Sequence, residues 1–297
     1  MGSLLHANCL FIQGKHKEAF RAYEEILRAY PDALAASNIG YMYHRGIAVV
    51  RDYAKALAYY SAAQERDGGV SLFNTALMYL RGQGVEVDFK KAIGLMRLSA
   101  HHGCADARLY LGLAYILGYA YDPVDIECLS LIPFYRVIYR DESQPLLGGD
   151  GFDPALDDKR YEAIEADENE AVEMYGRLSA EHNHDPYAEK QYAAAEFMLG
   201  KAYIEGLGDH YNPRLGYRKI YDAAIYLDSA EAAQFLIANK AVASGHHINV
   251  DKIELLATHG HFRRTMGNPG TPYSHRVPLL LPDEKSHNIH KLCGNLL

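Results

Sequence analysis

A motif that returns every 36 residues constrains the fold of this chain more than any other feature. It reads "IGYMYHRG" at 39–46, "TALMYLRG" at 75–82 and "LGLAYILG" at 111–118, and a further copy, "LGKAYIEG", stands at 199–206. Each copy holds one tyrosine and ends at a glycine: Tyr43, Tyr79, Tyr115 and Tyr203, then Gly46, Gly82, Gly118 and Gly206. A period of this length is typical of solenoids, in which one supersecondary unit is repeated along the chain.

Each copy predicts two antiparallel helices joined by a short turn. The first helix is a stretch of small and apolar residues that ends at the glycine in the left-handed conformation. Asp52 and Asp88 then occupy the positions of helix N-caps and are followed by segments with one apolar face. The "RGQGV" stretch at 81–85 is therefore predicted to be a turn and not a phosphate-binding loop, which needs a third glycine or a Gly-Lys-Ser/Thr sequence.

The repeated positions resemble the Sel1-like repeat, a relative of the tetratricopeptide repeat. The copy that runs from Leu77 to Ala92 matches it best, although Ala76 stands where the family prefers glycine. Asn212 replaces the capping aspartate of the last copy. The resemblance implies an all-α, right-handed superhelical solenoid of about six antiparallel helix pairs. It also implies binding to other proteins, because such solenoids present a long surface for partners.

The repeat divides the chain into four segments. We expect helical repeats at 1–118, an acidic insertion at 119–166, further repeats with a degenerate capping pair at 167–260, and a Pro-rich extended tail at 261–297 that packs on the last repeats. Within them the predicted helix pairs are 3–31, which is closer to the tetratricopeptide type, 33–67, 70–103, 105–117 with 168–182, 191–226 and 229–260. The insertion separates the two helices of the fourth pair.

The net negative charge of the chain is concentrated in and just after the insertion. From Asp141 to Glu170 there are eleven acidic residues against Lys159 and Arg160, whereas the formal charge of the whole chain is -8. One interpretation is an acidic lobe that contacts a basic surface on a partner; the other is a solvated loop that its charges keep soluble. The candidate contact residues are Asp141, Glu142, Asp150, Asp153, Asp157 and Asp158.

The first helices supply a second set of candidate partner-binding residues, since first helices line the concave face in tetratricopeptide-type arrays. These candidates are His44, Arg45, Leu80, Arg81, Ile116, Lys201 and Glu205. The alternative for each is an ordinary solvated position.

We predict no cofactor, no metal and no enzymatic activity. The four cysteines include no C-x-x-C pair, and no nucleophile motif such as Gly-x-Ser-x-Gly is present. Histidines gather in the last 52 residues, where His259 and His261 with Asp251 offer metal ligands. Hydrogen-bonded or exposed histidines are the simpler interpretation, so a metal-binding protein or enzyme is only our third hypothesis.

Charge and hydropathy argue against nucleic-acid binding and against a membrane-spanning segment. An acidic chain is a poor ligand for nucleic acid, and no run of 18 apolar residues predicts a membrane span. No secretion signal begins the chain. We expect a bacterial protein that lies in the periplasm if a leader has been removed, and otherwise in the cytoplasm.

The resemblance to the Sel1-like repeat implies two functional hypotheses of different kinds, because bacterial members of that family include immunity proteins as well as adaptors. The first hypothesis, which the single large acidic insertion favours, is an immunity protein that wraps a cognate toxic effector, such as a type VI secretion phospholipase with a basic surface, and blocks its active site with the acidic insertion. The alternative is an adaptor in regulation or envelope assembly.

Overall fold

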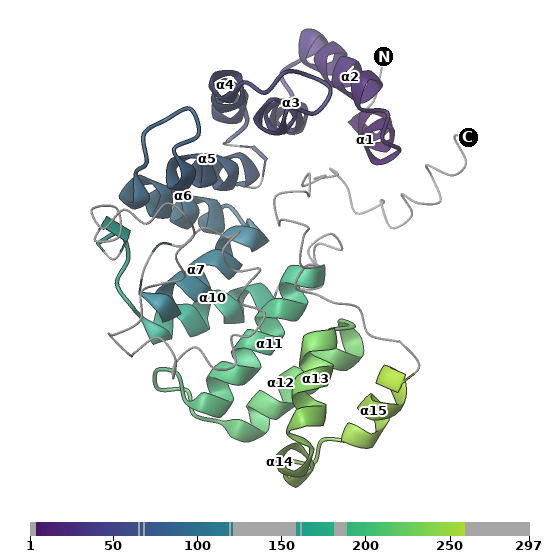
Figure 1. The fold of residues 1–297 in the computed structure, drawn as a ribbon, viewed down its shortest axis with the longest axis vertical. Coiled ribbons are helices and arrows are strands. Elements are labelled where there is room, and N and C mark those ends of the chain that lie inside the picture. Colours follow the sequence, from purple (N-terminus) through teal and green to yellow (C-terminus); the bar gives the residue numbers. More distant parts are fainter. Residues whose placement is uncertain are drawn as a thin grey trace, which may run out of the picture. The chain divides into compact units, whose positions relative to one another are not determined.

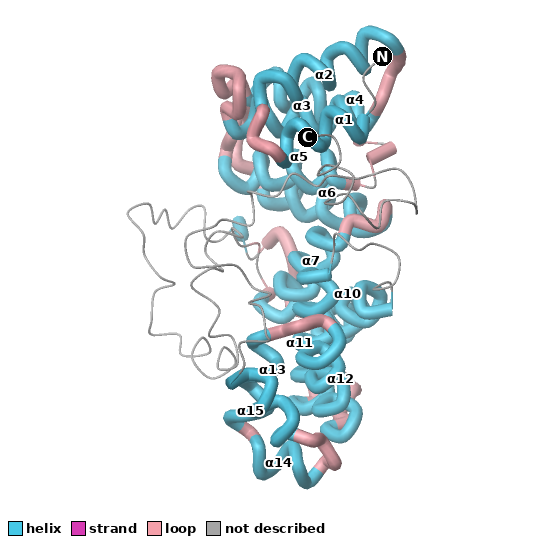
Figure 2. Tube along the Cα trace, turned by 90° about the vertical axis from the view of Figure 1, so that its right-hand side faces the viewer, coloured by secondary structure: helices cyan, strands magenta, loops and turns pink. Residues whose placement is uncertain are grey.

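The computed structural model describes residues 4–64, 66–67, 69–118, 120, 159–160, 162–180 and 189–258. All regular elements in these residues are helices, and none of them is a β-strand (Figure 2). The chain divides into two compact units, of which unit 1 runs to Ala107 and unit 2 begins at Arg108.

Unit 1 contains three helix pairs (Figure 1). They are α1 (Leu4–Ile12) with α2 (His16–Ala29), α3 (Ala33–Arg45) with α4 (Tyr53–Ala63), and α5 (Val70–Arg81) with α6 (Phe89–His101). Apolar residues at helical spacing form the core: Tyr23 and Ile26 of α2 pack with Ile39 and Met42 of α3, and all four are at most 2% exposed.

Unit 2 continues the helix pairs and ends in shorter helices. Its elements are α7 (Ala105–Leu117), which starts at the boundary of the units, α10 (Glu168–Ala180), α11 (Glu189–Glu205), α12 (Pro213–Tyr226), α13 (Ala230–Ala238), α14 (Lys240–Gly245) and α15 (Val250–Thr258). The stretch after α12 was expected to form one degenerate pair, and it forms three helices. Helix α13 ends at Ala238 because Asn239 leaves the helical geometry, with φ of -109° and ψ of 28°, while its side-chain amide bonds to the carbonyl of Phe235.

The same main-chain closure joins the two helices of four pairs. In each, the tyrosine of the repeat accepts a hydrogen bond through its carbonyl from the backbone N–H of the capping residue. The bonds run from Asp52 to Tyr43 (3.0 Å), Asp88 to Tyr79 (3.0 Å), Asp167 to Tyr115 (3.0 Å) and Asn212 to Tyr203 (2.8 Å). The closing glycines have the predicted left-handed φ, which is 71° at Gly46, 64° at Gly82, 72° at Gly118 and 72° at Gly206.

The capping residues behave as their sequence positions predict. The side chains of Asp52 and Asp88 accept from the backbone N–H three residues ahead, and Asn212 does the same for Leu215. Asp167 caps α10 through the N–H groups of Asn169 and Glu170. The substitution of Asn212 for aspartate therefore keeps the cap, because an amide oxygen accepts as a carboxylate does.

One turn contains an alanine in a conformation that suits glycine. Two residues after the closing glycine, φ is 74° at Gly84, 58° at Gly208 and 62° at Ala48. At Gly84 a Cβ atom would lie 2.6 Å from the Cβ of Tyr53, so glycine is required there for space as well. Ala48 is exposed and costs only the backbone strain of a left-handed alanine, about 1–2 kcal/mol.

The glycine in the first helix of the repeat lets the second helix approach closely. A Cβ atom would lie 2.8 Å from the Tyr60 ring at Gly40 and 2.6 Å from the Tyr175 ring at Gly112. Both rings belong to the residue eight positions after the cap. In the remaining copy of unit 1, Ala76 replaces the glycine and Met96, a flexible side chain, takes the place of the tyrosine. The predicted all-α fold of successive helix pairs is thus confirmed in the described residues.

Candidate partner-binding surface

Most faces of helix α3 pack against other helices of unit 1. Ile39 and Met42 face α2, and Gly40 lies against Tyr60 of α4. A further face of α3 and its equivalent on α5, 36 residues later, form what we call the first-helix stripe: Asn38, Tyr41 and Arg45 of α3 with Asn74, Leu77 and Arg81 of α5. Asn38, Tyr41 and Leu77 are buried, and Tyr41 packs with Tyr60 and Met78, so only Arg45, Asn74 and Arg81 of the stripe are half-buried. These residues share a face because each trio follows helical spacing.

The seven candidates that the sequence placed on first helices differ in how far the structure buries them. Arg45 and Arg81 belong to the first-helix stripe and are half-buried, as is Ile116 of α7. His44 and Leu80 are 6% and 7% exposed, so these two are not solvated positions.

His44 lies at the junction of two repeats in unit 1. Its Nε2 is 2.7 Å from Oε1 of Gln83 in the next turn, and its Nδ1 is 3.3 Å from the Tyr60 hydroxyl. A neutral ring with its proton on Nε2 satisfies both contacts, since Nε2 then donates to Gln83 and Nδ1 accepts from Tyr60. Burial lowers the pKa of His44, and the positive charges of Arg45, Arg81 and Arg51 lower it further. The sequence analysis did not identify Tyr60 and Gln83 as its partners.

Replacement of His44 by leucine, the residue at the equivalent position 80, is expected to reduce the acid sensitivity of the fold. Because the pKa of His44 is lower in the folded chain than in the unfolded chain, the unfolded chain takes up the proton first as the pH falls below about 6.5. Stability due to neutral His44 is therefore present above this pH and decreases below it. Urea unfolding at pH 7.5, 6.5 and 5.5 measures the effect, and an identical decrease in both proteins would contradict it.

The remaining two candidates form a partly buried ion pair on α11 of unit 2. Lys201 is 5% exposed and its Nζ lies 3.6 Å from Oε1 of Glu205, one turn further along the helix. Burial lowers the pKa of Lys201, while the charge of Glu205 acts in the opposite direction. The exposed end of this pair is the Glu205 carboxylate.

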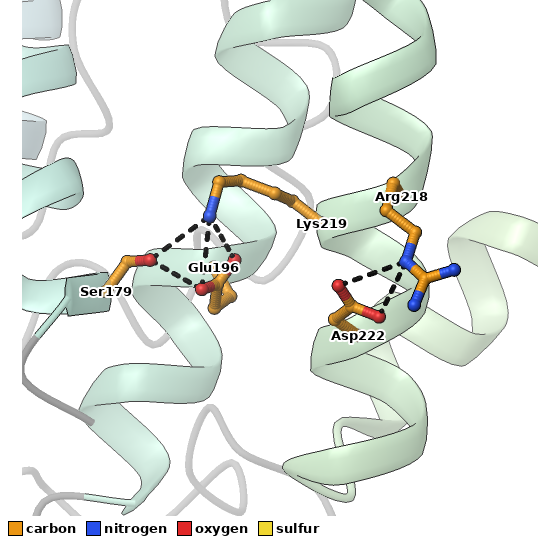
Figure 3. A network of polar contacts seen from close by, with 5 residues as sticks. All are labelled: Ser179, Glu196, Arg218, Lys219 and Asp222. Carbon is orange, nitrogen blue, oxygen red and sulfur yellow. Dashed lines mark hydrogen bonds and ion pairs between the residues drawn. The ribbon is translucent and has the colours of Figure 1, made fainter. Parts of the chain in front are cut away.

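A network of polar side chains connects α10, α11 and α12 in unit 2 (Figure 3). The Lys219 ammonium lies 3.1 Å and 3.3 Å from the two oxygens of Glu196 and 3.3 Å from the Ser179 hydroxyl, which also donates to Glu196. Beside it, Arg218 pairs with Asp222 at 3.1 Å, and burial raises the pKa of Asp222.

The network has the residue types of a nucleophile and a base, but its geometry favours a structural role. A lysine that activates a serine must be able to take up its proton. The Ser179 hydroxyl donates its hydrogen to Glu196 and accepts from the Lys219 ammonium, so the lysine is not placed to receive that proton. We infer that the network fixes the relative positions of three helices.

Two described histidines of the C-terminal cluster lie at the end of α14. His246 stacks on Tyr217 with ring centroids 5.0 Å apart, and His247 adopts a φ of 65°. Within 4–258, as far as the structure describes it, no group of three His, Cys, Asp or Glu side chains is placed to hold a metal ion. His259 and His261 lie outside the described residues.

The acidic candidates Asp141, Glu142, Asp150, Asp153, Asp157 and Asp158 also lie outside the described residues. At the end of the insertion the structure describes the return of the chain to the repeat. Ala166 lies against Gly118: a Cβ atom added to Gly118 would be 3.1 Å from the Cβ atom of Ala166. Asp167 then closes the turn through its bond to Tyr115. The acidic Glu168 accepts from the backbone N–H of Gly208 at 2.8 Å and so supports the next turn.

Among the described helices, none is both long and apolar enough to cross a bilayer.

Comparison with known proteins finds repeats of one kind in both units. The family model described as "Sel1 repeat" matches residues 33–66, 69–104 and 193–218. The interrupted copy formed by α7 and α10 lies outside these matches, although it shares their closure. No curated protein matches the chain.

Solved structures provide a likeness of fold. A Sel1 repeat protein from Oxalobacter formigenes is 18% identical, with a TM-score of 0.52 over 75% of this chain and 49% of that chain. The structure of c5321, a protective antigen present in uropathogenic Escherichia coli strains displaying an SLR fold, is 15% identical, with a TM-score of 0.37 over 87% of this chain and 61% of that one. The chain thus spans about half the length of the Oxalobacter protein. Segments that match the Sel1 repeat in both units, together with this likeness of fold, support a Sel1-like repeat protein.

Proposed function

We propose that the chain is a protein-binding module and, more specifically, an immunity protein that binds and neutralises a cognate toxic effector. One observation carries the proposal: a long acidic segment is inserted in a repeat turn whose closure is kept. Asp167 follows Gly118 by 49 positions, whereas the capping residue of the other turns follows its glycine by six. The bond from Asp167 to Tyr115 is nevertheless 3.0 Å, as in the uninterrupted repeats.

The chemistry of the insertion specifies the kind of partner. A surplus of carboxylates attracts a basic surface, and complementary charge both accelerates encounter and fixes orientation. A toxic enzyme such as a type VI secretion phospholipase, with a basic rim around its substrate entrance, would be blocked by such a segment. The carboxylates proposed for this contact are Asp141, Glu142, Asp150, Asp153, Asp157 and Asp158. A single large insertion supports one dedicated partner better than the several partners of an adaptor.

The test replaces residues 119–166 with "QGVEV", the five residues that link Gly82 to Asp88 in the neighbouring repeat. Because the closure is a main-chain bond, we expect the variant to keep its helix content and to melt at a temperature no lower than that of the native chain. Pull-down from a lysate of the source organism should recover one stoichiometric partner with the native chain and none with the variant.

A second variant separates charge from length. It keeps the insertion and changes its six candidate carboxylates to Asn or Gln. We expect it to lose the partner as well, and we expect native binding to weaken with salt. Co-expression of the partner should harm cells unless the native chain is present. Retention of the partner by both variants would exclude the acidic segment as the contact, and several substoichiometric partners would favour the adaptor.

A further inference from the structure

Helix α1 of unit 1 is apolar on two opposite faces. Leu4 and Ala7 pack in the core that α1 shares with α2 and α3. Because each residue of a helix turns the chain by about 100°, Leu5, Cys9 and Ile12 lie on the other side of α1. We call these three residues the outer stripe. A helix that packs on one side only has polar residues on its second face, so an apolar outer stripe indicates that a further segment covers α1.

Cys9, in the middle of the outer stripe, is covered although its place on the helix faces away from the core. It is 2% exposed, whereas Leu5 is half-buried and Ile12 is 43% exposed. Cys9 is also joined to a second cysteine by a disulfide bond. The segment that carries this second cysteine is thus held against the outer stripe.

The cysteine content of the chain limits the partner of Cys9 to two residues. The chain has four cysteines, of which Cys104 is free and buried. Burial raises the pKa of the Cys104 thiol to about 12, so this thiol stays protonated and unreactive. The second cysteine is therefore Cys128 or Cys293, and both lie outside the described residues.

The lengths of chain that lead to these two cysteines favour Cys293. Cys128 stands ten positions after Gly118, so an extended chain carries it at most about 35 Å from that turn. The insertion that contains it is also held at its far end, where Asp167 closes the turn. Cys293 stands 35 positions after Thr258, the last residue of α15, and the intervening chain spans up to about 120 Å. Cys293 therefore has the longer reach.

The neighbours of the two cysteines favour Cys293 as well. Glu127 precedes Cys128 and would bring a carboxylate to the apolar outer stripe, where its desolvation is costly. Leu292 precedes Cys293, and Leu296 follows it closely, so this segment brings apolar side chains. Their burial against the outer stripe removes apolar surface from water on both sides of the contact.

We infer that Cys9 and Cys293 form a disulfide bond that holds residues 292–297 on the outer stripe of α1. The bond forms when the two thiols give two protons and two electrons to a protein disulfide of an oxidising compartment, which becomes a dithiol. For residues 292–297 this is an alternative to the expectation that the tail packs on the last repeats. The inference does not depend on the proposed immunity role.

Peptide mapping without reduction identifies the bond. The native full chain is secreted to a bacterial periplasm, its free thiols are blocked with iodoacetamide, and it is digested with trypsin. Cleavage after lysine and arginine leaves Cys9 in peptide 1–15, Cys128 in peptide 109–136 and Cys293 in peptide 292–297. We expect mass spectrometry to find 1–15 joined to 292–297, and the two peptides to separate after reduction.

Matched cysteine variants provide the control. In Cys293→Ser, Cys9 should become reactive toward a maleimide in urea, whereas in Cys128→Ser it should stay unreactive. Reduction of the native chain should speed amide hydrogen exchange in α1 by about tenfold or more, because α1 loses the cover of its outer stripe. Cys293→Ser should show this faster exchange without reductant. Exchange in α6 should not change in any of these samples, which also confirms that the variants are folded.

Three results would overturn the inference: a free Cys9 thiol in the secreted native chain, peptide 1–15 joined to 109–136, or an unchanged α1 exchange rate in Cys293→Ser. The last result would mean that residues 292–297 do not lie on the outer stripe, even if the bond is present.

Discussion

Replacing Gly200 with alanine is expected to lower the free energy of unfolding of unit 2 by about 3 kcal/mol. Helices α11 and α12 approach each other closely at this glycine, where a Cβ atom would lie 2.7 Å from the carbonyl oxygen of Gly216 and 2.5 Å from a side-chain carbon of Ile220. Overpacking of a close contact costs about 1–3 kcal/mol and more where the neighbour cannot move, which exceeds the gain of about 1 kcal/mol from better helix propensity. Urea unfolding followed by circular dichroism measures the change.

Gly176 of α10 provides the control for Gly200, because no atom lies within 4 Å of the Cβ position there. Alanine at this position should raise the free energy of unfolding by about 0.5–1 kcal/mol. The loss at Gly200 should also persist in an Ile220→Ala background, since the Gly216 oxygen belongs to the backbone. A stabilising Gly200→Ala substitution would mean that α11 and α12 separate at little cost.

Alanine at Gly112 is expected to destabilise the interrupted repeat by about 2 kcal/mol, and a second substitution should reverse part of this loss. The three atoms nearest to the Cβ atom would all belong to the ring of Tyr175, which is 1% exposed and whose hydroxyl has no hydrogen-bond partner. The neighbouring repeat has Ala76 and Met96 at these two positions. Tyr175→Met alone should cost about 1–2 kcal/mol through lost packing.

The double-mutant cycle of Gly112→Ala and Tyr175→Met tests this interpretation. The free energy of unfolding lost by the double variant should be smaller than the sum of the two single losses by at least about 1 kcal/mol. The reason is that alanine and methionine fit together at these positions, whereas alanine and tyrosine do not. Additive losses would show that the Ala76 and Met96 pair does not compensate in the way proposed. At Gly112 the contact is to a side chain, so a second substitution can relieve it. At Gly200 the contact is partly to the backbone, so the loss of stability should remain when Ile220 is changed.

The fold was largely predictable because its determinants are local. A left-handed glycine, a capping side chain and a helical apolar pattern each act over a few residues, so Gly82 and Asp88 identify a turn without further information. The division of the expected last pair into three helices was missed because the break after α13 is a departure of Asn239 from helical backbone geometry, which no periodicity reports.

The candidate surface was only partly predictable. Arg45 and Arg81 were selected from their place in the repeat, but the sequence did not reveal that His44, one position away, is buried against Tyr60 and Gln83.

The closure between Tyr115 and Asp167 also bears on chain entropy. Closing a flexible loop costs free energy that grows only with the logarithm of its length, so extending the span from six to 49 positions adds about 2 kcal/mol. The bond that closes the turn involves only main-chain atoms, and it is indifferent to the sequence between its ends. A repeat protein of this design can therefore acquire a long new segment at a turn for a free energy similar to that of a single core substitution, while its helix pairs keep their geometry.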